Sequence, residues 1–268
     1  QVCTNWLQPL VDLAEKDQQI GIVGSKLIGA DGKLQEAGGI IWKDATGWNF
    51  GLGNEPDLPA YNYVKETDYV SGASLLIRKD IWDEVGGFDE RYVPAYFEDT
   101  DLAFEVRKRG YKVMYQPLSE VIHFEGVSNG TSEESGIKSY QKVNRTKFRE
   151  KWSAELEREH FENAVDVFAA RDRSRDKKAI LVVDHYVPTY DKDAGSRAVF
   201  NYLKLLLDMG YNVKFIGDNF CHEEPYTTTL EQMGIEVLFG ANYAQGEWKT
   251  WLLENQDHFA AAVLNRPH

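Results

Sequence analysis

The stretch YFEDTDLAFEVRKRGYKV, residues 96–113, places three acidic residues within four positions and continues at once into a helical pattern. Glu98, Asp99 and Asp101 follow directly on two aromatic residues. Carboxylates in the first turn of a helix are stabilised by the helix dipole by roughly 0.3–1 kcal/mol, so a plain helix start explains the cluster. Acids at the rim of an apolar wall can also acquire pKa values suited to proton transfer. Both interpretations stay open at this point.

The residues around this stretch predict a mixture of helices and strands over residues 1–155. Apolar spacing and turn signals such as Asp31-Gly32 and Gly86-Gly87 define the elements. In chain order we first expect a helix over 5–17, then a strand, hairpin turn and strand over 20–42, and a buried strand over 69–77. A short helix from 79 and the acidic helix follow. The last elements are a strand over 112–122, broken at Pro117, and an amphipathic helix over 137–152.

Residues 178–268 have a different pattern, in which strand, helix, strand, helix and strand follow one another at short spacing. This order predicts a parallel, doubly wound sheet. Residues 156–177 between the two parts are highly charged and lack a strand signal, so they predict a helical linker. We therefore expect an α/β protein with one domain on each side of this linker.

Composition excludes several classes of protein. The net charge of −13 argues against a nucleic-acid partner and against an anionic membrane surface. No apolar run approaches the roughly 20 residues of a membrane span, so we expect no transmembrane segment. Cys3 and Cys221 match no disulfide or metal spacing. We expect a cytoplasmic location, with the inner face of the membrane as a possible site of action, and both chain ends look cut from something longer.

Four motifs occur in order in the first part: LQEAGGIIW (34–42), DYVSGASLLIRKDIWDEVGGFDERY (68–92), YFEDTDLAFEVRKRGYKVMYQP (96–117) and VIHFEGVS (121–128). Together they resemble the C-terminal half of a family 2 glycosyltransferase with the GT-A fold, over residues 1 to about 152. The resemblance implies a partial GT-A domain over residues 1–155 that holds the acceptor and the catalytic base.

The resemblance also implies roles for the acidic cluster. Asp99 would be the general base that takes a proton from the acceptor hydroxyl during an inverting transfer. Glu98 would orient the site, and Asp101 would help to cap the helix. The Asp-Thr-Asp triplet is not interpreted as the metal motif of the family, because chance matches are expected in a chain rich in Asp.

Two further positions acquire roles from the same resemblance. His123 would complete the coordination of Mg²⁺ or Mn²⁺ in the intact enzyme, although a lone His beside apolar residues is more often a satisfied core residue. Ser71, Gly72 and Ala73 match a loop where the donor sugar approaches the backbone. The alternative is a glycine packed between strands.

The second part contains VVDHYVPTYDKDAGSRAVFNYLKLLLDMGYNVKFI, residues 182–216, which resembles the N-terminal Rossmann-like domain of family 4-type GT-B glycosyltransferases. The resemblance implies that Asp193, Gly195, Ser196 and Arg197 bind a donor phosphate or the acceptor. The alternative is an ordinary strand-to-helix loop with Ser196 as the N-cap.

Both resemblances imply a fragment of a bacterial, multidomain glycosyltransferase of polysaccharide and cell-envelope biosynthesis. It would transfer a sugar from a nucleotide-sugar donor to a growing glycan or lipid-linked glycan. The donor-binding parts of both families lie outside the matched motifs, so we expect the chain alone to be inactive. The alternative is a non-catalytic carbohydrate-binding or scaffolding module. A dehydrogenase is poorly supported, because no G-x-G-x-x-G follows a strand.

Overall fold

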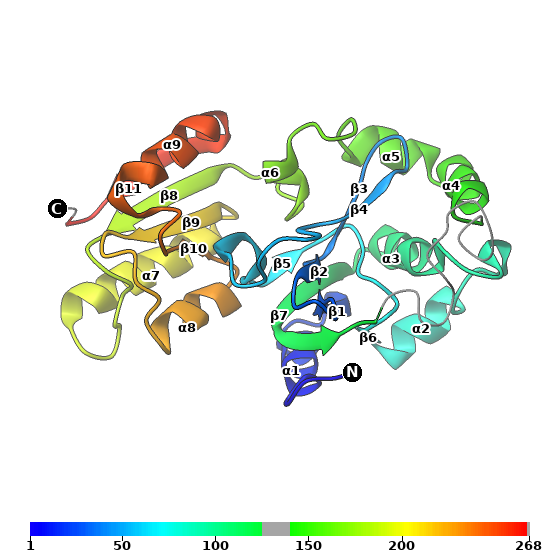
Figure 1. Cartoon of the computed structure of the whole chain (residues 1–268), viewed down its shortest axis with the longest axis horizontal. Coiled ribbons are helices and arrows are strands. Elements are labelled where there is room, and N and C mark those ends of the chain that lie inside the picture. The colour runs from blue at the N-terminus through cyan, green and yellow to red at the C-terminus, as the bar shows by residue number, and fades with distance from the viewer. Residues whose placement is uncertain (125–139, 267–268) are drawn as a thin grey trace. The chain divides into compact units, whose positions relative to one another are not determined.

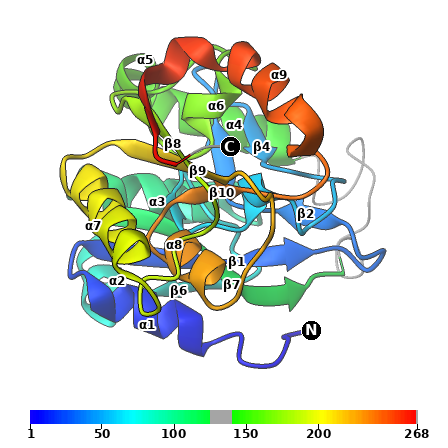
Figure 2. The same ribbon diagram turned by 90° about the vertical axis from the view of Figure 1, so that its left-hand side faces the viewer.

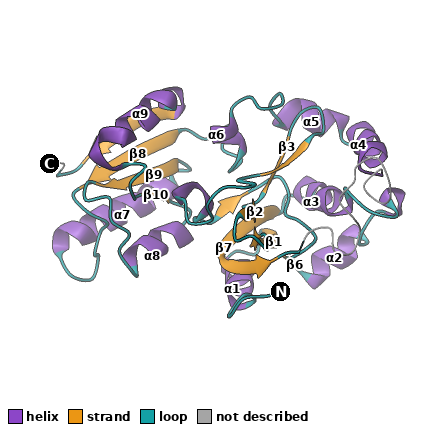
Figure 3. Cartoon of the chain, viewed as in Figure 1, coloured by secondary structure: helices purple, strands orange, loops and turns teal. Residues whose placement is uncertain are grey.

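The computed structural model describes residues 1–124 and 140–266 of the 268. The chain divides into two compact units, the first formed by Gln1–Pro56 and Lys65–Arg173, the second by Asp57–Val64 and Ser174–His268. Each unit combines helices and strands (Figures 1 and 3). The prediction of a mixed α/β protein is confirmed at this level.

The first unit is organised around β1 (Ile20–Ile28), a strand that is buried along almost its whole length. Its parallel neighbour is β7 (Lys112–Ile122), and the antiparallel β6 (Leu75–Ile77) and β2 (Leu34–Glu36) pair with its first and last parts. A fifth strand, β5 (Lys65–Glu66), pairs with β7. Of the strand predicted over residues 69–77, only the three residues of β6 form a strand, and the residues before them form a loop.

Helices lie on opposite sides of this sheet (Figures 1 and 2). On one side, α1 (Gln8–Lys16) buries Leu10, Leu13 and Ala14, which share one helical face. On the other side lies α3 (Glu98–Lys108), the helix of the acidic cluster. The remaining elements of the unit are the strand pair β3 (Gly39–Ile41) and β4 (Gly47–Asn49) and the helices α2 (Lys79–Val85), α4 (Tyr140–Lys151), α5 (Ser153–Glu159) and α6 (Val167–Ala170).

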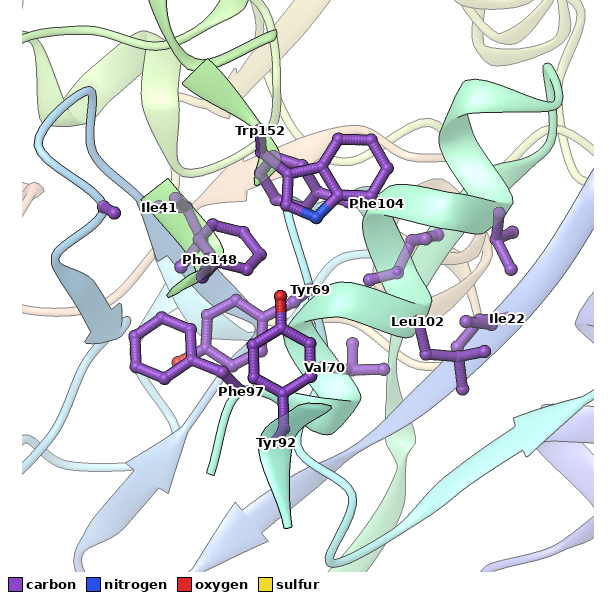
Figure 4. Close-up of a cluster of buried hydrophobic side chains, with 14 of the residues drawn as sticks. Ile22, Ile41, Tyr69, Val70, Tyr92, Phe97, Leu102, Phe104, Phe148 and Trp152 are labelled. Atoms are coloured by element: carbon purple, nitrogen blue, oxygen red, sulfur yellow. The ribbon is translucent and has the colours of Figure 1, made fainter. Parts of the chain in front are cut away.

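An aromatic cluster fixes the position of α3. The ring of Phe104 lies 4.8 Å from that of Phe148 and 5.3 Å from that of Trp152, and Phe97 lies 5.2 Å from Phe148. Figure 4 shows these side chains gathered beside α3. Phe148 and Trp152 come from the predicted amphipathic helix, so α4 and its continuation hold the acidic helix in place.

The predicted linker at 156–177 is largely wrong, because residues up to Arg173 belong to the first unit. Leu156 is buried in the main core. Arg173 forms an ion pair with Asp68, which also binds Arg107 at 3.0 Å and is only 5% exposed. Two of the charges that made this segment look like a solvated linker, Glu159 and Arg173, thus belong to the network around Asp68.

The electrostatics of Asp68 show how strongly this network is coupled. Burial alone would raise the pKa of Asp68, but the neighbouring His160, Arg173 and Arg107 hold it far below its ordinary value. A carboxylate with a lowered folded pKa contributes stability above its unfolded pKa of about 3.9 and loses it as the pH falls toward the folded value.

The second unit contains a parallel sheet in the order β10 (Glu236–Leu238), β9 (Asn212–Gly217), β8 (Ala179–Asp184) and β11 (Phe259–Leu264). The helices α7 (Ala194–Asp208) and α8 (Tyr226–Gln232) pack on one face, and α9 (Glu247–Glu254) packs on the other. The predicted parallel sheet with helices on both faces is confirmed. Its relation to GT-B enzymes stays a prediction.

Residues 57–64 belong to this second unit, which the sequence pattern did not predict. The Val64 amide donates a hydrogen bond to the carbonyl of Glu231 at 2.9 Å. Lys214 and Glu236, both fully buried, form an ion pair at 2.7 Å, and the Lys214 ammonium lies 4.9 Å from the ring of Tyr63. The segment therefore covers a buried charge pair.

In the described part of the chain, no helix is long and apolar enough to cross a membrane.

Replacing Asp68 with Asn tests the buried network. Asp68→Asn removes the buried carboxylate that Arg107 and Arg173 share, although Arg173 keeps Glu159 and Glu66, so we expect it to lower the free energy of unfolding at pH 7 by about 3–5 kcal/mol. The matched control is Asp83→Asn, which breaks an exposed pair with Lys79 and should cost less than about 1 kcal/mol. Urea denaturation followed by tryptophan fluorescence measures both, and equal losses would contradict the assignment.

Candidate active site

A pocket of about 450 Å³ lies in the first unit. Its walls come from β2, from the strand pair β3 and β4, from the loop 69–73, from the start of α3 and from the residues that follow β7. It brings together all of the site residues that the sequence predicted in the first part: Ser71, Gly72, Ala73, Glu98, Asp99 and His123. Predicted residues that span positions 71 to 123 of the sequence thus line one cavity.

Asp99 is half-buried, and three donors fix its carboxylate. The Gly72 amide donates to Oδ2 at 2.8 Å, and the amide and hydroxyl of Thr100 donate to Oδ1 at 2.7 and 3.2 Å. A Cβ added to Gly72 would lie 3.5 Å from Asp99, an ordinary contact. Packing within the protein therefore does not require glycine at this position, and the alternative of a glycine packed between strands is wrong.

The backbone that leads into α3 is strained. Tyr96 and Phe97 have φ values of 73° and 75°, a left-handed conformation that costs a residue with a side chain roughly 1–2 kcal/mol. Asn144, which is fully buried, donates through its side-chain amide to the carbonyls of Tyr92, Ala95 and Tyr96 at 2.8, 2.8 and 3.1 Å. This residue holds the turn that presents the acids, and no pattern in the sequence indicated it.

Asp101 turns away from the pocket into the core. Its carboxylate accepts hydrogen bonds from the Tyr92 hydroxyl at 2.9 Å, the Trp152 indole at 2.7 Å and the Lys151 ammonium at 2.8 Å. The expectation that Asp101 helps to cap the helix is therefore wrong, because these side chains use its oxygens. The acidic cluster divides into two pocket residues and one structural residue.

The carboxyl groups of the pocket have raised pKa values. Burial raises the pKa of Asp99, and burial followed by the neighbouring charge of Asp99 raises that of Glu98. Neither Lys nor Arg is found among the described residues that line the pocket. Carboxyl groups with raised pKa values are suited to proton transfer near neutral pH.

Glu36 is a pocket residue to which the sequence interpretation gave no role. It is 1% exposed, and its Oε1 accepts a hydrogen bond from the Ser71 amide at 2.9 Å. Burial, together with the nearby charge of Asp99, raises the pKa of Glu36 to about 8. The available signal was a single acidic residue inside a mostly apolar motif, LQEAGGIIW.

His123 follows β7 directly and lines the same pocket. One ring nitrogen, Nδ1, lies 3.0 Å from the amide oxygen of Gln35. No group of three His, Cys, Asp or Glu side chains within residues 1–124 and 140–266 could hold a metal ion. The described residues thus do not form the expected Mg²⁺ or Mn²⁺ site, and His123 would supply one ligand at most.

The candidate residues of the second unit form a capped helix start. Asp193 is the N-cap of α7, and its carboxylate accepts the Ser196 amide at 2.8 Å and the Ser196 hydroxyl at 2.6 Å. These hydrogen bonds lower the pKa of Asp193. Arg197 donates to the carbonyl of Tyr190 at 3.2 Å, and an added Cβ on Gly195 would lie 2.8 Å from the Arg266 side chain.

This geometry corrects the alternative that named Ser196 as the N-cap. Ser196 is fully buried and satisfied by Asp193, so its donors do not face a ligand. Substrate binding by Asp193, Gly195 and Arg197 stays a prediction.

Comparison with known proteins relates the chain to glycosyltransferases. It is 39% identical over 74 residues to an N-acetylglucosaminyl-diphospho-decaprenol L-rhamnosyltransferase of Mycobacterium tuberculosis, which covers 28% of this chain and 24% of the relative. It is 28% identical over 131 residues to the O-antigen biosynthesis protein RfbC of Myxococcus xanthus, 46% of this chain and 10% of the relative. An uncharacterized protein y4gI of Sinorhizobium fredii is 32% identical over 133 residues, 48% of this chain and 14% of the relative.

These matches span a quarter or less of each relative's length. No family model matches the chain. The solved structure of GalNAc-T7 with UDP, GalNAc and Mn²⁺ is similar with a TM-score of 0.42 and 19% identity, over 59% of this chain and 31% of that one. A similarity at that level does not establish a shared fold. The predicted relationship to glycosyltransferases is confirmed in sequence, whereas the GT-A and GT-B assignments stay predictions.

The raised pKa of Glu36 predicts a pH-dependent gain in stability for Glu36→Gln. An unfolded Glu ionises near pH 4.3 and the folded one near pH 8, so ionisation increasingly favours the unfolded state as the pH rises between these values. Gln stays neutral and keeps an oxygen for the Ser71 amide. We expect the variant to be more stable than the unsubstituted chain, and this difference in the free energy of unfolding should grow by about 3–5 kcal/mol from pH 5 to pH 8.

Urea denaturation at both pH values measures this gain. Glu15→Gln on the exposed side of α1 serves as the control, with little change expected at either pH. A pH-independent difference between Glu36→Gln and the unsubstituted chain would contradict the protonated state of Glu36.

Proposed function

We propose that the first unit is the acceptor-binding and catalytic-base part of an inverting glycosyltransferase with the GT-A fold. The observation that carries the proposal is the Asp99 carboxylate, fixed by the Gly72 amide at 2.8 Å within the pocket that also contains His123. The acceptor oxygen would form a bond to the anomeric carbon while its proton passes to Asp99. The bond from that carbon to the diphosphate oxygen would break, and its electron pair would leave with the nucleotide.

Asp99 is better suited to this role than the other two pocket acids. Glu36, with a pKa of about 8, holds its proton at neutral pH and cannot accept another. Glu98 has one buried oxygen, Oε2, without a hydrogen-bond partner in the described residues, so its carboxylate is held less completely than that of Asp99. Asp99 combines a raised pKa with donors on both carboxylate oxygens, and correct orientation is a large part of catalytic efficiency.

The relatives indicate the substrate class. One is named as a rhamnosyltransferase that acts on a lipid-linked diphospho-sugar and another as an O-antigen biosynthesis protein. We therefore propose a nucleotide-sugar donor and a glycan or lipid-linked glycan acceptor, in the synthesis of a bacterial cell-envelope polysaccharide at the cytoplasmic face. We propose that the second unit is the first part of a GT-B domain. No step of this chemistry is assigned to a metal, because the described residues do not form a metal site.

Asp99→Asn tests the base assignment. In the intact protein it should lower turnover by about 10²–10⁴-fold, because the amide cannot accept the acceptor proton. Asp80→Asn is the matched control, since Asp80 also lies in the first turn of a helix, α2, and is not among the residues that line the pocket. Steady-state kinetics with a nucleotide-sugar donor measures both. Normal turnover in Asp99→Asn would refute the assignment.

A second candidate function is a carbohydrate-binding or scaffolding module without turnover. The specific observation in its favour is that the described pocket residues include no Lys or Arg that would pair with a donor diphosphate. In both cases we expect the 268-residue chain to bind nucleotide-sugars weakly or not at all, which calorimetry with UDP-N-acetylglucosamine and dTDP-L-rhamnose measures. Micromolar affinity would show that the chain contains a donor site. Donor binding by the intact protein separates the enzyme from the scaffold.

A further inference from the structure

Glu36 has a buried side chain, and only one of its two carboxyl oxygens accepts a hydrogen bond from the described residues. It lies at the end of β2, is 1% exposed and lines the pocket. Its Oε1 accepts the Ser71 amide at 2.9 Å, whereas no residue within 1–124 and 140–266 forms a hydrogen bond to Oε2. Because Glu36 lines the pocket, a molecule bound there can supply the hydrogen-bond partner that Oε2 lacks within the described residues.

The loop 71–73 couples Glu36 to Asp99. The adjacent amides of Ser71 and Gly72 donate to Glu36 and Asp99, at 2.9 and 2.8 Å. Two successive peptide units of one loop thus position both carboxyl groups, and both groups line the same cavity. A single bound molecule would contact the two groups together.

The composition of the walls indicates the kind of molecule. The described lining has no cationic Lys or Arg to attract a phosphate. It consists mainly of carboxyl, amide and aromatic side chains: Glu36, Glu98, Asp99, Gln35, Asn49, Gln141, Tyr69, Tyr96, Phe97 and Phe124. Such groups bind an uncharged polyhydroxyl ring, with hydrogen bonds to its hydroxyls and contacts to its apolar face.

We propose that Glu36 is a sugar-binding residue that determines specificity, with Oε2 hydrogen-bonded to one hydroxyl of the acceptor sugar while Asp99 faces the hydroxyl that reacts. This inference rests on the proposed function and adds the residue that recognises the acceptor. It assigns the pocket to the acceptor sugar and places the donor diphosphate outside it.

The protonation state of Glu36 supports a donor role. With a pKa of about 8, its carboxyl group donates a hydrogen bond at neutral pH and becomes a carboxylate at higher pH. Ionised Glu36 would also add a second negative charge beside Asp99. The other titratable groups around it are those that share the pocket or are coupled to its charge: Asp99 and Glu98 of α3, His123, Tyr69 and Tyr115.

Ligand-observed NMR of the 268-residue chain with N-acetylglucosamine and methyl α-L-rhamnoside tests the proposal. We expect the unsubstituted chain to bind at least one of these sugars and to lose affinity as the pH rises through about 8. Glu36→Met should bind about tenfold more weakly at pH 7, since it keeps the volume but no hydrogen bond. Glu36→Gln should show little change in affinity between pH 7 and pH 9, because its amide donates at both. Circular dichroism establishes that each variant is folded.

The outcomes separate this inference from the proposed function. Equal sugar affinity in Glu36→Met and the unsubstituted chain overturns the role of Glu36, as does the same alkaline loss in Glu36→Gln. The proposed function still stands in either case if Asp99→Asn abolishes turnover in the intact protein. Absence of sugar binding by the unsubstituted chain overturns the assignment of the pocket to the acceptor, and tighter binding of inorganic diphosphate than of either sugar does the same.

Discussion

The buried carboxylate of Asp101 fixes the amino end of α3, and the pocket depends on that position. Its three donors come from Tyr92, which precedes the helix, and from Lys151 and Trp152 at the carboxyl end of α4. An acid removed from water needs such partners to remain in place. Because Asp101 is held from both sides, Glu98 and Asp99 project from a rigid helix start and not from a free loop. Asn144 adds to this by holding the left-handed turn that precedes the acids.

The sequence predicted elements whose signals are local. Apolar spacing correctly indicated α1, the acidic helix, the parallel sheet of the second unit and the amphipathic segment around Phe148 and Trp152. It also grouped Asp99, His123 and the loop 71–73 in one predicted site, because the order of their motifs resembles that of a glycosyltransferase family. The pocket contains all of these residues, although their chemical roles are still predictions.

Other features depend on contacts between distant residues, and local patterns do not encode such contacts. The charged segment after residue 155 resembles a solvated linker unless Arg173 is known to meet Asp68. Asp193 and Ser196 are both suitable N-caps, and only the start of the helix decides between them. Glu36 lies in a quoted motif, but its importance follows from complete burial and from the charge of Asp99, neither of which is visible in one sequence.

The assignment of residues 57–64 to the second unit has a consequence for how this chain can be divided. The polypeptide passes between the units three times, after residues 56, 64 and 173. A fragment ending at residue 173 would retain Tyr63 without the buried Lys214–Glu236 pair that it covers. A fragment beginning at residue 174 would leave that pair uncovered. Neither unit is a continuous piece of sequence, so excision at a single boundary damages both. Replacing residues 57–64 by a short connection would make the first unit continuous, but the second unit needs this segment supplied to it.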